Sequence, residues 1–445
     1  MRGIILSFAI VLLPAMAFAD DDTSQSPKRA LPSYDGRGPD PSNTDGAGVW
    51  TARIVLSPLY LTSEFLLRRP IGAFVTAIET SAALRTLYDF FAFGPDRKIG
   101  FLPVGVLEFG FNPSVGFYGF WNDALVKHND LRLHYEVWPQ DWLYGSITDR
   151  FHIDADRTFQ LRVEGLHRPD MTFFGLGPTS LQSNLSRYSK SLFDLSGSLD
   201  GRYWQSSHVQ ATLGLRKVDV SPGHYGSDPS IEQEAARVFG APIPYGFDRG
   251  YLAPYNKFLA TLDTRHPKRT SGTGVRFAVD SEEGANLEQS PASGWIRYGA
   301  TGTVFIDLND RGRVLALKVG ALFADPLGNG PIPFTELVSL GGDSWMHGYF
   351  PGRLVDRSAA VALLSYSWPI APKLDATIEV STGNVFGTHL EDFRPGLLRL
   401  SGSLGLSAAL GDPPVEFLVG LGTETFEHGA QVDSIRLMIG VPRSF

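Results

Sequence analysis

The stretch Asp130-Leu131-Arg132-Leu133-His134-Tyr135-Glu136-Val137 alternates polar and apolar side chains one for one. Successive side chains of a β-strand point to opposite faces, so this run has one polar and one apolar face. Residues 158–167 repeat the pattern. In a soluble sandwich the apolar face packs on a core, whereas in a membrane barrel it contacts lipid and the polar face lines the lumen. The pattern therefore predicts strands, and leaves open which side is wet.

The beginning of the chain decides between the two. Arg2 precedes the apolar stretch 4–13, and Ala17-Phe18-Ala19 forms a small-x-small cleavage site. Such a segment is typical of a secretory signal peptide, and its apolar part is shorter than the roughly 20 residues of a membrane-spanning helix. We therefore expect a signal peptide at 1–19, and an exported barrel in the outer membrane of a Gram-negative bacterium.

Composition excludes several classes of protein. The chain has no cysteine, so it is neither a lipoprotein nor a disulfide scaffold. Its net charge is -8 and it has no basic stripe, which excludes nucleic acid as a partner. No Gly-x-Ser-x-Gly, His-Glu-x-x-His or phosphate-binding loop motif occurs, and the ten histidines lack metal-ligand spacing. No enzymatic activity, metal or cofactor is predicted.

Three segments follow the signal peptide. Residues 20–48 form a polar linker, because 18 of the 29 are Asp, Pro, Gly or Ser. Residues 49–98 are apolar and are predicted to be partly helical, with a helix expected to begin near Pro70. One face of that helix is apolar, which fits an interfacial or barrel-plugging helix as well as a simple packed helix. The β-barrel itself is expected over 99–445.

Sixteen strands are predicted, which gives a 16-stranded antiparallel β-barrel. Most of them have the ~9–11 residues that a tilted membrane strand needs, so the barrel is predicted to be transmembrane. An even number of strands puts both ends on the periplasmic side. Short connections should then follow even-numbered strands, and the long connections 168–189, 217–255 and 324–357 follow odd-numbered strands. The strands are expected at 100–109, 114–122, 129–137, 143–152, 158–167, 190–200, 206–216, 256–264, 272–281, 295–307, 313–323, 358–368, 373–383, 398–410, 415–423 and 435–445.

The last strand has an apolar face that ends on the terminal Phe445, with Arg436 on the opposite face. A closing strand of this kind resembles the assembly signal of outer-membrane barrels, although Arg443 stands where a second aromatic residue is expected. An ordinary edge strand is the alternative. Gly440 and Pro442 weaken the backbone ladder, since proline donates no hydrogen bond. They predict a loose seam between the first and last strands.

One further stretch combines glycines, aromatic residues and charges in a fixed order. Its segments are Leu340-Gly341-Gly342-Asp343-Ser344-Trp345-Met346-His347-Gly348-Tyr349, Pro351-Gly352-Arg353, Asp356-Arg357-Ser358 and Leu364-Ser365-Tyr366-Ser367-Trp368-Pro369-Ile370. This stretch resembles the BamA/TamA outer-membrane family. Two looser matches are 173–178 and 263–265, and the resemblance covers roughly 99–445.

The resemblance implies that this segment is the sixth outer loop of a sixteen-stranded barrel and folds back into the lumen. Three departures concern the loop's anchor. His347 replaces the family's loop arginine, Ser365-Tyr366-Ser367 replaces Glu-Tyr-Arg, and Ser381 replaces an aspartate. Glu379 shares the lumenal face of Ser381 and is a candidate partner of His347, which would raise the pKa of this histidine. Hydrogen bonds from His347 to Ser365, Ser381 or water are the alternative.

The resemblance also implies the function classes. Members of the family carry periplasmic POTRA modules, and residues 20–93 do not show their strand and helix pattern. The chain is therefore expected to be a barrel-only member. One hypothesis is outer-membrane protein assembly or protein translocation through the seam. Its partners would be outer-membrane lipids, unfolded outer-membrane or exported proteins, and a periplasmic accessory protein. The other is a barrel without insertase activity, acting in lipid handling, as a channel or as an anchor for surface loops.

Overall fold

The computed structural model describes most of the chain from residue 90 onward. The predicted signal peptide 1–19, the linker 20–48 and most of the segment 49–98 lie outside the described residues, as do Pro442 and Phe445. The described ranges are 90–139, 141–235, 243–247, 249–265, 272–288, 293–308, 312–371, 374–408 and 414–440.

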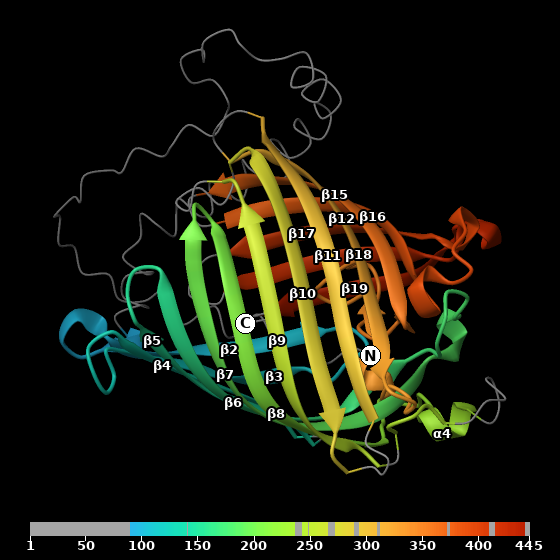
Figure 1. The fold of residues 1–445 in the computed structure, drawn as a ribbon, viewed down its shortest axis with the longest axis horizontal. Helices are drawn as coiled ribbons and strands as arrows, with labels where there is room; N and C mark the ends of the chain where they lie inside the picture. Colours follow the sequence, from blue (N-terminus) through green and yellow to red (C-terminus); the bar gives the residue numbers. More distant parts are fainter. Residues whose placement is uncertain are drawn as a thin grey trace, which may run out of the picture. The chain divides into compact units, whose positions relative to one another are not determined.

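Sixteen antiparallel strands close into a barrel, in which each strand pairs with its neighbours in chain order and β19 returns to β2 (Figure 1). The predicted fold class is confirmed. The barrel strands are β2 (Ile99–Glu108), β3 (Ser114–Asn122), β4 (Asn129–Trp138), β5 (Trp142–His152), β6 (Arg157–Phe173), β7 (Ser186–Trp204), β8 (Ser207–Pro222), β9 (Tyr251–Asp263), β10 (Gly274–Asn286), β11 (Ser293–Asp307), β12 (Val314–Leu327), β15 (Ser358–Ala371), β16 (Leu374–Phe386), β17 (Arg399–Ala408), β18 (Val415–Thr423) and β19 (Val432–Gly440).

Short elements occupy the connections. None of the helices in the described part of the chain is long and apolar enough to cross a membrane. The remaining elements are β1 (Ala92–Phe93), which pairs with β2, the pair β13 (Val338–Leu340) and β14 (Leu354–Asp356), the helix α4 (Ile231–Glu234), and the single turns η2 (Pro95–Arg97), η3 (Gln182–Asn184), η5 (Phe334–Glu336), η6 (Thr388–Leu390), η7 (Pro395–Leu397) and η8 (Phe426–His428).

Every predicted strand has a counterpart, and those at 114–122 and 415–423 have the predicted bounds. The strands β6, β7 and β8 are longer than predicted, with 17, 19 and 16 residues. The prediction for β6 stopped at residue 167, ahead of Pro169. The structure accommodates this proline at a register shift in the β6–β7 ladder, where no ladder hydrogen bond is required.

The connections are as unequal as predicted. Those after β6, β8 and β12, the fifth, seventh and eleventh strands of the barrel, span 174–185, 223–250 and 328–357. The turn between β7 and β8 has only two residues, 205–206. The long connections therefore all leave one end of the barrel.

The faces of the wall follow the alternation in the sequence. In β4, the side chain of Leu133 is on the outer surface and 38% exposed, whereas those of His134 and Glu136 are buried inside. Phe277 and Leu317 are examples of the same outward apolar exposure on β10 and β12. The wall is thus apolar outside and polar inside, which is the arrangement of a membrane barrel.

The described part of the ladder between the first and last strands is short. Three residue pairs join β19 to β2 in the described chain, from Met438 opposite Glu108 to Gly440 opposite Val106. Eight pairs join β2 to β3, and eight join β18 to β19. A Cβ atom on Gly440 would lie 2.3 Å from the carbonyl oxygen of Gly105, so glycine permits the close approach here.

Candidate functional site

The connection 328–357 turns back into the barrel and forms an apolar core with the inner wall. Four of its apolar side chains are fully buried: Leu340, Met346, Tyr349 and Leu354. They pack with wall residues that include Tyr251, Trp295 and Ala359. Burial of this much apolar surface stabilises the inward conformation of the loop. We call this segment the inner loop.

Glycines set the tight path of the inner loop. Gly341 has φ 107° and Gly342 has φ 72°, in the region that other residues rarely adopt. A Cβ on Gly341 would lie 2.5 Å from the carbonyl oxygen of Phe350. The amide of Gly341 donates to the carbonyl of Trp345 at 2.9 Å, and that of Gly342 to the carbonyl of Tyr349 at 2.9 Å. The predicted motif thus forms a compact turn.

Gly348 lies against the wall with no room for a side chain. A Cβ there would be 2.0 Å from the carbonyl oxygen of Leu421. Its amide donates to Oγ of Ser401 at 2.8 Å, and its carbonyl accepts from Oγ of Ser434 at 2.9 Å. Facing it on β18 is another glycine, Gly420, whose own Cβ would meet the Gly348 Cα at 2.7 Å. The two backbones therefore pack directly on each other.

Tyr349 fastens the loop to β17 and β18. Its hydroxyl accepts from the amide of Thr423 at 2.8 Å and lies 2.9 Å from the carbonyl oxygen of Leu400 and 2.5 Å from that of Thr423. One hydroxyl proton serves only one of the two carbonyls at a time. A buried hydroxyl requires such partners, so this tyrosine specifies the depth at which the loop sits.

His347 meets the carboxylate expected from the sequence. Its Nδ1 lies 2.5 Å from Oε2 of Glu379, and its Nε2 lies 3.2 Å from the carbonyl oxygen of Asp343. Burial by itself lowers the pKa of His347, but the hydrogen bond and charge of Glu379 outweigh it and raise the pKa above its ordinary value. A raised pKa favours the protonated imidazole, so the contact with Glu379 is stronger at acidic pH than at neutral pH.

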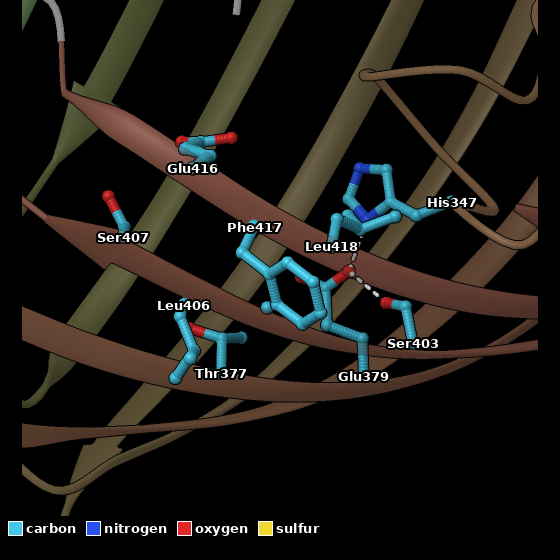
Figure 2. A pocket seen from close by; sticks show the side chains of 10 residues that line it. His347, Thr377, Glu379, Ser403, Leu406, Ser407, Glu416, Phe417 and Leu418 are labelled. Atoms are coloured by element: carbon cyan, nitrogen blue, oxygen red, sulfur yellow. Dashed lines mark hydrogen bonds and ion pairs between the residues drawn. The ribbon is translucent and has the colours of Figure 1, made fainter. Parts of the chain in front are cut away.

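The pair borders a cavity of about 170 Å³ inside the wall (Figure 2). Oγ of Ser403 lies 3.4 Å from the same Glu379 oxygen, and Glu416 is a second carboxylate in the lining. The cavity is wide enough for several water molecules.

The other residues singled out in the sequence, Ser381, Ser365 and Asp356, make no hydrogen bond to His347 in the described part of the chain. Oγ of Ser381 donates weakly, at 3.4 Å, to the carbonyl of Ser401, so it reaches Gly348 only through that residue. The described part of the chain contains no hydrogen bond between Ser365 and the inner loop; this serine pairs with Ala316 in the β12–β15 ladder. Asp356 ends β14 and accepts the amide of Arg357 at 2.7 Å.

Sequence reasoning missed a buried charged anchor of the loop, Arg436 on β19. Its guanidinium donates to the carbonyl of Gly342 at 2.7 Å, to Oδ1 of Asp343 at 2.6 Å and to Oε1 of Glu108 at 2.6 Å. Only 1% of this residue is exposed. An arginine on the lumenal face of a strand requires a buried acceptor, and this requirement could have identified Arg436 from the sequence as a candidate anchor.

A second buried arginine, Arg353, lies near the C-terminal end of the inner loop and binds residues outside it. Arg353 is fully buried, donates to Asp433 at 3.0 Å, to Ser180 at 2.8 Å and to Gln182 at 3.0 Å. Its guanidinium lies 5.1 Å from the ring centre of Phe174. It ties the inner loop to the connection after β6, where one of the looser sequence matches falls.

Comparison with known proteins supports the fold. No model of a known protein family and no curated protein matches the sequence. BamA from Haemophilus ducreyi lacking POTRA domains 1-3 is similar in structure, with a TM-score of 0.52, 14% identity, and 77% of this chain and 70% of that chain covered. The chain has the BamA barrel fold. CdiB from Acinetobacter baumannii has a TM-score of 0.47 at 12% identity, with 77% of this chain and 60% of that chain covered.

Proposed function

We propose that this protein is an outer-membrane barrel that assembles or translocates other proteins through the seam between β2 and β19. The observation that carries the proposal is the described part of this seam, where three residue pairs join β19 to β2 and Gly440 packs closely on Gly105. Each backbone pair contributes hydrogen bonds that otherwise close a barrel, so the wall separates most easily where pairs are fewest. Polypeptide strands entering at the seam would pair with the edges exposed there.

The wall and the loop motif support the same function. The apolar outer surface suits the membrane core, with lipid as the first partner. The inner loop and its Gly-Gly-x(n)-His-Gly-Tyr motif resemble the sixth loop of the BamA/TamA family, whose members act on outer-membrane or exported proteins. Such clients and a periplasmic accessory protein are the proposed partners. No catalytic chemistry is part of the proposal.

Depletion in the native cell, followed by quantification of the outer-membrane proteome, tests this function. A joint fall of many barrels identifies an assembly factor, and the loss of one exported protein identifies a dedicated translocator. A complementing copy whose first and last strands are cross-linked provides the matched control, because it keeps the fold and removes the seam. An unchanged proteome after depletion would reject the proposal.

A barrel without insertase activity is the second candidate, and one observation favours it. The strands β6, β7 and β8 exceed the roughly 9–11 residues that cross a membrane. The helix α4 lies in the connection after β8, and Asp228 of this connection pairs with Arg187 of β7 at 2.7 Å. Strands that extend past the membrane and an ion pair that fixes their connection suit an anchor for surface loops. Depletion that changes lipid balance or surface binding, with barrels unaffected, would support it.

A further inference from the structure

The inner loop is fastened to the last strand at two points. Oγ of Ser434 donates to the carbonyl of Gly348 at 2.9 Å. Two residues further along β19, Arg436 donates to the carbonyl of Gly342 and to the carboxylate of Asp343. The last strand is therefore held by the loop as well as by β18.

The same arginine reaches across the seam to the first strand. Its Nε donates to Oε1 of Glu108 at 2.6 Å, and Glu108 is only 7% exposed. Each group on the planar guanidinium thus has a separate acceptor: one on β2 and two on the loop. Buried charges are tolerated when they are paired in this way, and the loss of one partner leaves the others uncompensated.

A second link joins the loop to the first strand without Arg436. The ring of Phe111, in the connection after β2, packs edge-on against the ring of Phe350 with centroids 5.5 Å apart. Phe111 is 3% exposed. The neighbouring amide of Asn112 donates to Oδ2 of Asp170 at 2.6 Å, so this connection is fixed in place. The inner loop therefore contacts both sides of the seam.

We propose that Arg436 is a positioning residue through which the seated inner loop holds the seam closed. The inference rests on the proposed function, in which the seam is the route of the client. Three β19–β2 pairs are described, at 438–440, and the three hydrogen bonds of Arg436 act directly beside them. Withdrawal of the loop removes two of its acceptors and leaves a buried cation beside the seam. Seating of the loop and closure of the seam therefore stabilise each other.

The contact between Arg436 and Asp343 has the opposite polarity to the anchor that the sequence resemblance implies, and it exists beside the His347–Glu379 pair. There the arginine is on the loop and the carboxylates are on the wall. Here the wall supplies the arginine and the loop supplies Asp343, while His347 replaces the loop arginine. The reversal places the cation within reach of Glu108, which connects the anchor directly to the first strand.

Cysteine cross-linking tests the coupling in the full chain folded in lipid vesicles. The chain has no cysteine of its own. Leu107 and Ile439 are register partners across the seam, and Val419 and Leu437 are partners between β18 and β19. The rate of oxidative cross-linking of Leu107→Cys with Ile439→Cys reports seam closure. The pair Val419→Cys with Leu437→Cys is the matched control in the neighbouring ladder.

Two substitutions in the inner loop test whether the loop holds the seam closed. Asp343→Asn and Phe350→Ala alter only loop side chains, and Asp343 is 41% exposed, so neither should prevent barrel folding. We expect either to slow cross-linking at the seam by at least about tenfold, equivalent to about 1.4 kcal/mol, with the control pair unaffected. Arg436→Lys keeps the charge but loses the fork and should give an intermediate rate.

Unchanged seam cross-linking in both loop variants would overturn the proposal. Equal slowing of the seam and control pairs would also overturn it, because that result indicates general loosening of the wall. The assay contains no client. A protein that shows the coupling but leaves the proteome unchanged on depletion would therefore refute the proposed function and not the role of Arg436.

Discussion

Replacing Gly348 by valine should release the inner loop from the barrel interior. The new Cβ would lie 2.0 Å from the carbonyl oxygen of Leu421, whereas real Cβ contacts exceed 3.0 Å. The loop would have to withdraw by about 1 Å or more, which breaks the hydrogen bonds with Ser401 and Ser434, at 2.8 and 2.9 Å. Each lost bond costs about 1 kcal/mol and overpacking adds about 1–3 kcal/mol. A total of at least about 3 kcal/mol raises the undocked population by at least about 100-fold.

Limited proteolysis of the folded barrel measures this release. Cleavage within 328–357 should be faster in Gly348→Val, since a docked loop must open before a protease can bind it. Gly145→Val is the matched control, because Gly145 is a glycine within a strand and no atom lies within 4 Å of the position that a Cβ would take there. Heat-modifiable migration on gels confirms that both barrels are closed. Equal cleavage rates in the two variants would refute the docked-loop geometry.

Three further predictions concern the loop anchors. Because Glu379 raises the pKa of His347, the docking energy of this pair is complete below pH about 6.5 and is lost as pH rises through the raised pKa. Protease resistance of the loop should fall over that interval, and Glu379→Gln should abolish the dependence; a persistent pH effect would point to another group. Tyr349→Phe should weaken docking by about 1 kcal/mol through loss of the hydroxyl, and unchanged cleavage kinetics would contradict this. Arg353→Ala should destabilise the barrel by about 1–3 kcal/mol, because the hydrogen bonds to Ser180 and Gln182 are lost. Asp433 then keeps only its longer contact with Arg399, at 3.5 Å. Urea unfolding measures this, and a shift no larger than that of an exposed arginine would rule it out.

The arrangement of the wall was predictable from the sequence because its causes are local. A side-chain period of two places Leu133 and His134 on opposite faces whatever the rest of the chain does. Turn lengths then fix which end carries the long connections. The predicted strands at 114–122 and 415–423 have the observed bounds for this reason. Where Pro169 interrupted the pattern, the prediction stopped early, since a ladder irregularity that tolerates proline requires a partner strand.

The anchors of the inner loop depend on residues far apart in the chain. The sequence suggested Glu379 for His347 because both the face and the loop motif were readable. Arg436 could be assigned only to a face. Its partners Glu108 and Asp343 are separated from it by 328 and 93 residues.

Alternation determines which way each side chain points, and so the sequence by itself determined an apolar exterior and a polar interior. Closure of the barrel and the path of the loop determine which side chains meet across the interior. Which side chains meet depends on strand register and on the backbone contact at Gly348 that fixes the loop. Burial then leaves each charged side chain only its nearest acceptor. Only the tertiary structure therefore decided that one arginine joins the loop to both strands of the seam.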